Sequence, residues 1–319
     1  MDVVDLQAVA PPSDWGVRVD AAAVGALADR WADDPFPLPA FDYPGTPTDR
    51  PERWWFDYVT LAVSVLACLW PPEGDEVWHA ELDGVWLDDA PGIFATLTRR
   101  LGSDGLDLPA VAALSDDDGR EWFRGRGTLQ LVPERTEVLR LVATCLLERW
   151  DGSARNLVDE AGRDVTEVAR LLVETVPGYL DRPETPVGEL RFDKLAHLAA
   201  AIMAAGTGWG SAGFAGFDDF PVYPDYMLPR VLRHVGVLRY SPELAERVDG
   251  RTIIPAGSGA EHGIRWATIH AGALLRSALR ERGNPVAAPA LDYRLWSAAV
   301  LGPDADSFGE HHRTITMRY

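Results

Sequence analysis

Pro224-Asp225-Tyr226-Met227-Leu228-Pro229-Arg230 places a carboxylate directly before a predicted helix. The apolar positions of that helix are Leu228, Val231, Leu232 and Val235. This spacing puts them on one face, as expected of a helix packed on a core. Asp225 can cap the helix by accepting hydrogen bonds from its first free N–H groups. Capping and catalysis are compatible, because a carboxylate held at a helix N-terminus has a fixed position and stays ionised.

Helical signals dominate the remainder of the chain. They occur in segments 20–31, 59–70, 136–149, 164–176, 194–205 and 264–282. The segment 59–70 is almost wholly apolar and is stopped by Pro71-Pro72, so we expect a buried helix there. Asp83-Gly84, between two apolar runs, predicts a tight β-hairpin. We therefore expect a mainly α fold with a small β-hairpin in its N-terminal half.

The distribution of residues along the chain suggests two parts. We expect residues 1–130 to form an N-terminal helical layer with the small β element, because the first 53 residues are rich in proline around one helix. Residues 131–319 would then form a helical domain that contains Lys194 and Asp225. The two parts would make one compact unit.

Charge and composition exclude several classes of protein. The 319 residues have a formal net charge of −19, which opposes binding to nucleic-acid polymers but not to a single nucleotide. The N-terminus lacks the pattern of a signal peptide, and no apolar run is long enough to cross a membrane, so we expect a soluble, cytoplasmic protein. Cys68 and Cys145 lie in apolar runs, where a free cysteine behaves as a small hydrophobic residue, and neither matches a metal or redox motif.

Other motifs do not support a metal or cofactor site. The histidines show no metal-ligand spacing, and there is no serine-hydrolase elbow. The acidic run 116–118 is typical of a solvated turn or helix start. The glycine pattern of 208–213 resembles a dinucleotide loop, but it follows a predicted helix rather than a strand, so we interpret it as a connecting loop. No metal or cofactor is expected.

Lys194 is the second residue that the sequence singles out. It lies near the start of an otherwise almost purely apolar helix, so its ammonium would face a cleft or the helix end. A lysine on the protein surface is the alternative. Together, Lys194 and Asp225 would suit cleavage of a bond at a sugar carbon, because a carboxylate stabilises the positive charge that develops there.

These residues resemble the queuosine salvage proteins. The family's phenylalanine-alanine-aspartate-tyrosine-x-leucine-proline motif appears here as Tyr223-Pro224-Asp225-Tyr226-Met227-Leu228-Pro229, and its lysine-x-alanine segment corresponds to Lys194-Leu195-Ala196. Further matches are 231–232, 236–241, Leu131-Val132-Pro133-Glu134-Arg135, Ile264-Arg265, Leu291-Asp292-Tyr293-Arg294-Leu295-Trp296, and His312-Arg313 with Tyr319. The resemblance runs from about Trp15 to the end of the sequence.

The resemblance implies a fold like that of helix-hairpin-helix DNA glycosylases and hydrolysis of queuosine 5′-phosphate, a 7-deazapurine nucleotide, to queuine and ribose 5-phosphate. Asp225 would stabilise the transition state, and Lys194 would keep Asp225 ionised or contact the phosphate. Further candidates for binding the substrate are Tyr223, Tyr226, Asp292, Trp296, His312 and Arg313. Trp296 could instead belong to the core, and Asp292 could be a helix cap.

Two departures from the family leave the substrate open. The family has polar residues after its first conserved tryptophan, whereas Trp55 is followed by the apolar run 59–70; a family aspartate after the lysine is replaced by Ile202. Another modified nucleoside or nucleotide is therefore an alternative substrate. A non-catalytic nucleotide-binding protein is a second alternative, which the presence of both Lys194 and Asp225 disfavours. A role in DNA repair would rest on fold alone.

Overall fold

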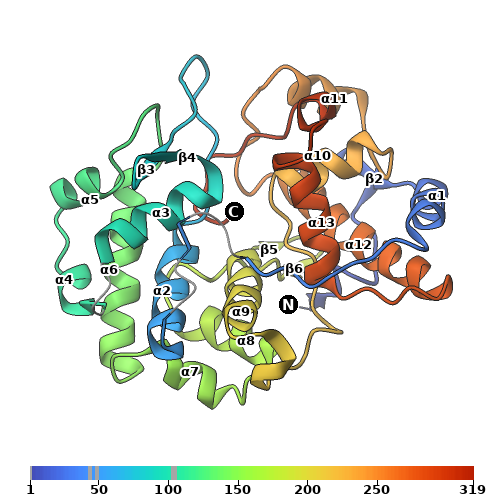
Figure 1. The fold of residues 1–319 in the computed structure, drawn as a ribbon. Coiled ribbons are helices and arrows are strands. Elements are labelled where there is room, and N and C mark those ends of the chain that lie inside the picture. The colour runs from blue at the N-terminus through green and yellow to red at the C-terminus, as the bar shows by residue number, and fades with distance from the viewer. Residues whose placement is uncertain (1, 42–44, 47–49, 102–105) are drawn as a thin grey trace. The chain divides into compact units, whose positions relative to one another are not determined.

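The computed structural model describes residues 2–41, 45–46, 50–101 and 106–319, which form mainly helices (Figure 1). The helices are α1 (Ala21–Trp31), α2 (Glu52–Ser64), α3 (Asp89–Leu101), α4 (Leu108–Ala112), α5 (Asp116–Trp122), α6 (Val132–Arg149), α7 (Ala154–Glu160), α8 (Val165–Thr175), α9 (Lys194–Gly206), α10 (Met227–His234), α11 (Pro242–Asp249), α12 (Gly259–Glu281) and α13 (Ala288–Val300). The strands are β1 (Val3–Val4), β2 (Val17–Val19), β3 (Ala80–Leu82), β4 (Val85–Leu87), β5 (Glu184–Thr185), β6 (Gly188–Leu190) and β7 (Leu238–Tyr240). The mainly α class is confirmed, while the relationship to helix-hairpin-helix glycosylases stays a prediction.

The chain divides into two compact units. Unit 1 comprises Met1–Pro39, Asp181–Lys194 and Gly216–Ile315, and unit 2 comprises Ala40–Leu180, Leu195–Ala215 and Thr316–Tyr319. Neither unit is one continuous stretch of sequence. All eight residues singled out for the candidate site belong to unit 1.

The core of unit 1 fixes the position of α10. Helix α10 buries Leu228, Val231 and Leu232, as its apolar spacing predicts, among buried residues of α1, α12 and α13. Short strands link distant parts of this unit: β2 pairs with β7 in antiparallel fashion, and β6 lies between β1 and β5. Because α10 is packed in this core, the position of the residues directly before it, including Asp225, is fixed at one end.

Unit 2 contains the predicted hairpin. Strands β3 and β4 pair in antiparallel fashion with Leu82 opposite Val85, and Asp83 and Gly84 both have positive φ, 50° and 82°. This is the conformation that an Asp-Gly turn in a two-residue hairpin loop favours. The hairpin prediction is confirmed.

The helix predicted over 59–70 is wrong in its bounds. Helix α2 begins at Glu52 and ends at Ser64, and the buried segment 65–70 is irregular. Arg135 of α6, which is fully buried, donates hydrogen bonds to the carbonyls of Val65, Ala67 and Cys68. These carbonyls have no helical N–H partner, so the guanidinium satisfies groups that would otherwise be buried without hydrogen bonds.

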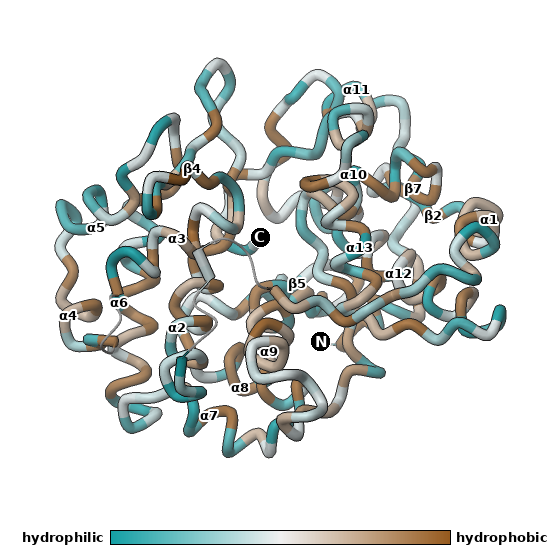
Figure 2. Tube along the Cα trace, in the orientation of Figure 1, coloured by the Kyte–Doolittle hydropathy of each residue, from teal (hydrophilic) through white to brown (hydrophobic). Residues whose placement is uncertain are grey.

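Other helix ends agree with their sequence signals. Ser115 and Asp118 form a capping box at α5, so the acidic run is a helix start, and Asp164 caps α8. In Figure 2, α5 is hydrophilic, whereas most of α9 has apolar colours. Segment 208–213 follows α9 as a short 3-10 turn, which confirms the connecting loop. Within the described residues, no helix has both the length and the apolar composition required to traverse a bilayer.

Candidate active site

Asp225 lies just before α10 and is nearly buried, with 9% of its surface exposed. Its Oδ1 accepts hydrogen bonds from the backbone N–H groups of Met227, at 2.8 Å, and Leu228, at 2.9 Å. The capping role that the sequence indicates is therefore present. Because α10 is anchored in the core of unit 1, these two bonds hold the carboxylate in a defined position.

Lys194 is the first residue of α9 and the only lysine in the sequence; every other residue counted among its 30 basic residues is arginine. Only 5% of Lys194 is exposed, so the alternative of a surface lysine is wrong. An ammonium is a compact point charge that can lose its proton, whereas a guanidinium is larger and remains charged. A chain that uses arginine everywhere else therefore has a chemically distinct cation at this position.

Asp292, which lies on α13, is the third charged residue of the site and interacts electrostatically with Asp225 and Lys194. Its Oδ2 accepts a hydrogen bond of 2.6 Å from the backbone N–H of Tyr223, and 7% of its surface is exposed. The alternative of a helix cap is wrong, because α13 begins earlier, at Ala288. Asp292 instead binds the backbone two residues before Asp225.

The two carboxyl groups and the ammonium form one buried group of interacting charges. Burial raises the pKa of Asp225, while the charge of Lys194 and the N–H groups of Leu228 and Met227 oppose the rise. Burial raises the pKa of Asp292 well above its ordinary value, and the negative charge of Asp225 raises it further. Two neighbouring carboxylates seldom both ionise in a buried site. The surroundings therefore favour protonation of Asp292 over protonation of Asp225.

Tyr223 and Tyr226 flank this charged group. Tyr223 is 2% exposed, and its hydroxyl has no hydrogen-bond partner within the described part of the chain. Burial, with the charge of Asp292, raises the pKa of Tyr223 well above its ordinary value, so the hydroxyl keeps its proton. Tyr226 is 7% exposed, and its ring lies 4.9 Å from that of His311. The Tyr223 hydroxyl is thus a buried polar group available to a ligand.

The remaining candidates differ in their surroundings. Burial lowers the pKa of His312 to about 3, so this imidazole is neutral at neutral pH and can only act as a hydrogen-bonding group. Arg313 keeps its charge and lies 3.6 Å from the Glu310 carboxylate. Trp296 is half-buried, packs against the core of unit 1 and stacks with Tyr293, which favours its structural alternative.

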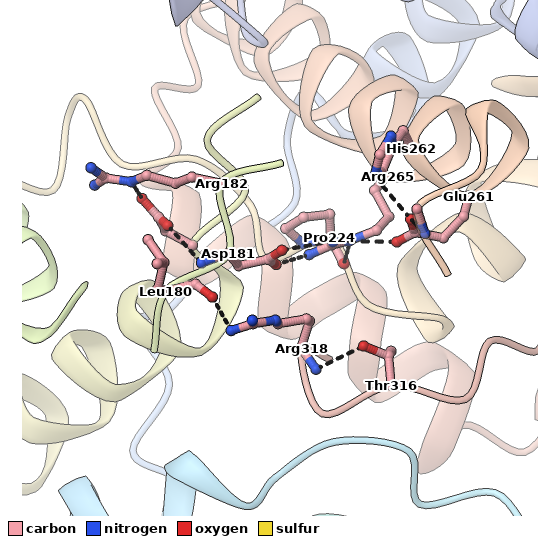
Figure 3. Close-up of polar contacts among 11 residues, drawn as sticks. Leu180, Asp181, Arg182, Pro224, Glu261, His262, Arg265, Thr316 and Arg318 are labelled. Carbon is pink, nitrogen blue, oxygen red and sulfur yellow. Dashed lines mark hydrogen bonds and ion pairs between the residues drawn. The ribbon is translucent and has the colours of Figure 1, made fainter. Parts of the chain in front are cut away.

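Sequence patterns did not predict a network of buried hydrogen bonds and ion pairs around Arg265 of α12. Its guanidinium contacts Asp181 and Glu261, and its Nε donates to the carbonyl of Pro224, the residue before Asp225 (Figure 3). The only sequence signal was the match of Ile264-Arg265, which gave no role. Glu261 lies four residues before Arg265, a local spacing that the sequence-based predictions did not use, whereas Asp181 and Pro224 are far away in sequence and leave no such signal.

Asp57 is the carboxylate nearest in sequence to the apolar run that departs from the family. It accepts hydrogen bonds from the Ser153 hydroxyl and from the N–H of Ala154 at the start of α7. Burial raises its pKa to about 6. In these contacts Asp57 joins α2 to α7, a structural role within unit 2. Across the described residues, no three His, Cys, Asp or Glu side chains cluster as a metal site.

Comparison with known proteins identifies the family. Residues 48–319 match the family described as "Queuosine salvage protein". The chain is 31% identical over 283 residues to a protein of Sphaerobacter thermophilus named queuosine 5′-phosphate N-glycosylase/hydrolase, covering 86% of each chain. Proteins of the same name from Mus musculus and Dictyostelium discoideum are 31% and 26% identical; the alignments cover 82% of this chain in each case and 81% and 77% of those proteins. This chain belongs to the queuosine salvage protein family.

Proposed function

We propose that this protein hydrolyses the N-glycosidic bond of queuosine 5′-phosphate and releases queuine and ribose 5-phosphate for salvage. The observation that carries the proposal is the buried group of Lys194, Asp225 and Asp292 in a member of this family. The relatives' shared name supplies the substrate. The protein would act on a small nucleotide in the cytoplasm rather than on a nucleic-acid polymer.

Asp225 is the proposed catalytic carboxylate. When the C1′–N9 bond breaks, its electron pair goes to the base and positive charge develops at the sugar. An ionised carboxylate stabilises that charge, and it either activates the water that bonds to C1′ or attacks C1′ directly. Lys194 and the two N–H groups at the start of α10 favour the ionised form of Asp225. This is the protonation state that either route requires.

The leaving base needs a proton or strong hydrogen bonds. A 7-deazapurine has carbon at position 7, so that position cannot take up a proton as the nitrogen of a purine can. Asp292 in its protonated form is a hydrogen-bond donor, like other carboxyl groups kept neutral by an apolar site. We assign to Asp292 the activation of the base, with the Tyr223 hydroxyl as a second donor.

The other candidates are assigned to binding. Tyr226 would offer an aromatic face to the base, whereas the packing of Trp296 against the core of unit 1 favours a structural role. Arg313 would supply the positive charge for the phosphate, since a planar guanidinium suits bidentate recognition, whereas neutral His312 would contribute a hydrogen bond. The assignments of Tyr226, Arg313 and His312 rest on residue chemistry and on their places in the family motifs.

Incubation with queuosine 5′-monophosphate, and separately with the unphosphorylated nucleoside, tests the proposal. Release of queuine, followed by mass spectrometry, is expected mainly from the monophosphate. Asp225→Asn keeps a hydrogen-bond acceptor for α10 but removes the charge, so it should retain the fold and lose turnover by about 100-fold or more. Wild-type rates in this variant would refute the role of Asp225. A folded wild-type protein that releases no queuine would refute the substrate.

A further inference from the structure

Arg265 is a buried cation whose hydrogen bonds include two carboxylates and a backbone carbonyl. It is 1% exposed and lies on α12. Nη1 lies 3.4 Å from Asp181 Oδ1 and 3.3 Å from Glu261 Oε1, and Nη2 donates to Asp181 Oδ2. Its guanidinium also lies 4.0 Å from the centre of the Phe192 ring. Figure 3 shows this guanidinium between Asp181 and Glu261.

One contact of Arg265 acts on the backbone of Asp225. Nε donates to the carbonyl of Pro224 at 3.2 Å. A peptide unit is planar, so fixing the Pro224 oxygen also fixes the nitrogen and the α-carbon of Asp225. The N–H of Asp225 donates to the carbonyl of Tyr223 at 2.8 Å, which closes a tight turn at the same point. Arg265 thus constrains the backbone from which the Asp225 carboxylate extends.

A second contact leads to the backbone of Lys194. The carbonyl of Asp181 accepts hydrogen bonds from the N–H groups of Phe192, at 3.1 Å, and Asp193, at 3.4 Å. Asp193 has a positive φ of 43°, a strained value for a residue other than glycine, and its carboxylate pairs with Arg182 at 2.8 Å. Lys194 follows directly. The Asp181–Arg265 pair therefore connects the segment before Lys194 to the segment before Asp225.

Stability alone does not explain this pair. Removing charges from water is expensive, and well-packed apolar residues often stabilise a core as well as a buried ion pair does. A buried pair is more useful where it specifies one arrangement of the chain. We propose that Arg265, held by Asp181, is a positioning residue that sets the Asp225 carboxylate relative to the Lys194 ammonium.

Arg276 offers a matched control on the same helix. It is also buried, at 8% exposed, and donates to the carbonyls of Val286, Phe220 and Asp218. Arg276 therefore resembles Arg265 in being buried and in donating hydrogen bonds to backbone carbonyls, although the carbonyls are different ones. Among the described residues, the hydrogen bonds of Arg276 involve neither the Pro224 carbonyl nor the Asp181 carboxylate.

The test compares Arg265→Lys, Arg265→Met and Asp181→Asn with Arg276→Lys. The activity arm rests on the proposed function and measures kcat and KM for queuosine 5′-monophosphate. We expect Arg265→Met and Asp181→Asn to lower kcat by up to about 100-fold, as misplacement of reacting groups does, with KM changed less. Arg265→Lys keeps the charge and should recover part of the loss, while Arg276→Lys should leave kcat near the wild-type value.

A second arm does not depend on the substrate. Because Lys194 is the only lysine, protein grown with [ε-¹³C]lysine gives one side-chain NMR signal. We expect that signal to shift in Asp181→Asn and to stay in place in Arg276→Met, which, unlike Arg276→Lys, adds no second lysine. Folded Asp181→Asn with wild-type kcat and an unmoved lysine signal would overturn the proposal. If wild type does not hydrolyse the substrate, the proposed function fails and the lysine signal alone decides the role of Arg265. If the Arg265 variants do not fold, Asp181→Asn still tests the proposal, because it weakens the Asp181–Arg265 pair and leaves Arg265 in place.

Discussion

At the scale of single residues, the charge of Lys194 is expected to control the ionisation of Asp225. That charge lowers the pKa of a carboxyl group that burial raises. In Lys194→Met the opposing charge is lost, so the folded pKa of Asp225 should rise and the carboxylate should protonate at higher pH. The acidic limb of the kcat/KM profile should then move to higher pH. If kcat/KM falls by the same factor at every pH and its acidic limb stays in place, Lys194 does not control the ionisation of Asp225.

The Tyr223 hydroxyl leads to a second prediction at this scale. It is buried without a hydrogen-bond partner in the described residues, so Tyr223→Phe should leave the free protein as stable as wild type or more stable. If the hydroxyl binds the base, KM should rise about 5- to 10-fold, equivalent to one hydrogen bond of about 1 kcal/mol.

Tyr179 is the matched control for this experiment. Its hydroxyl is also buried but donates to the carbonyl of Thr60 at 2.7 Å. Tyr179→Phe should therefore lower the thermal midpoint and leave KM unchanged. An unchanged KM in Tyr223→Phe would exclude its hydroxyl from binding.

Sequence patterns could identify Lys194 and Asp225 as candidates, because each stands out against an apolar helix. They could not give the burial of Lys194, nor the proximity of Asp292, whose partner Tyr223 lies 69 positions away. A protonation state depends on which charges the fold brings together. For that reason the separate states of the two carboxyl groups emerge only from the tertiary structure.

At the scale of elements, predictions succeeded where the signal is local. The Asp-Gly hairpin, the helix start in the acidic run 116–118 and the helix in segment 164–176 depend on neighbouring residues, and the structure contains all three. The bounds of α2 were wrong because a wholly apolar run has no polar face to mark where the helix ends. The pairing of β2 with β7 was missed because these strands are three residues long and lie far apart in sequence.

The end of α2 can be tested through Arg135. In Arg135→Met the carbonyls of Val65, Ala67 and Cys68 lose a charged donor inside unit 2, so we expect the free energy of unfolding to fall by about 3 kcal/mol or more. Arg140 on the same helix is a suitable control. It is partly exposed and pairs with Glu137 and Asp116, so Arg140→Met should lower the free energy of unfolding much less than Arg135→Met. Urea unfolding measures both; equal losses would show that Arg135 has no special role.

At the scale of the whole molecule, the net charge of −19 disfavours long-range attraction to a DNA polymer. Many arginines pair with carboxylates and leave little positive charge for a phosphate backbone; examples are Arg163 with Glu52 and Arg233 with Asp249. We therefore expect no saturable binding to a labelled DNA duplex in fluorescence anisotropy. The measurement belongs at about 10 mM salt, where charges act over about 30 Å and an electrostatic binder has its highest affinity. Saturable binding that weakens as salt is added would show a local cationic surface strong enough to overcome the net charge, and a polymeric substrate would then have to be considered.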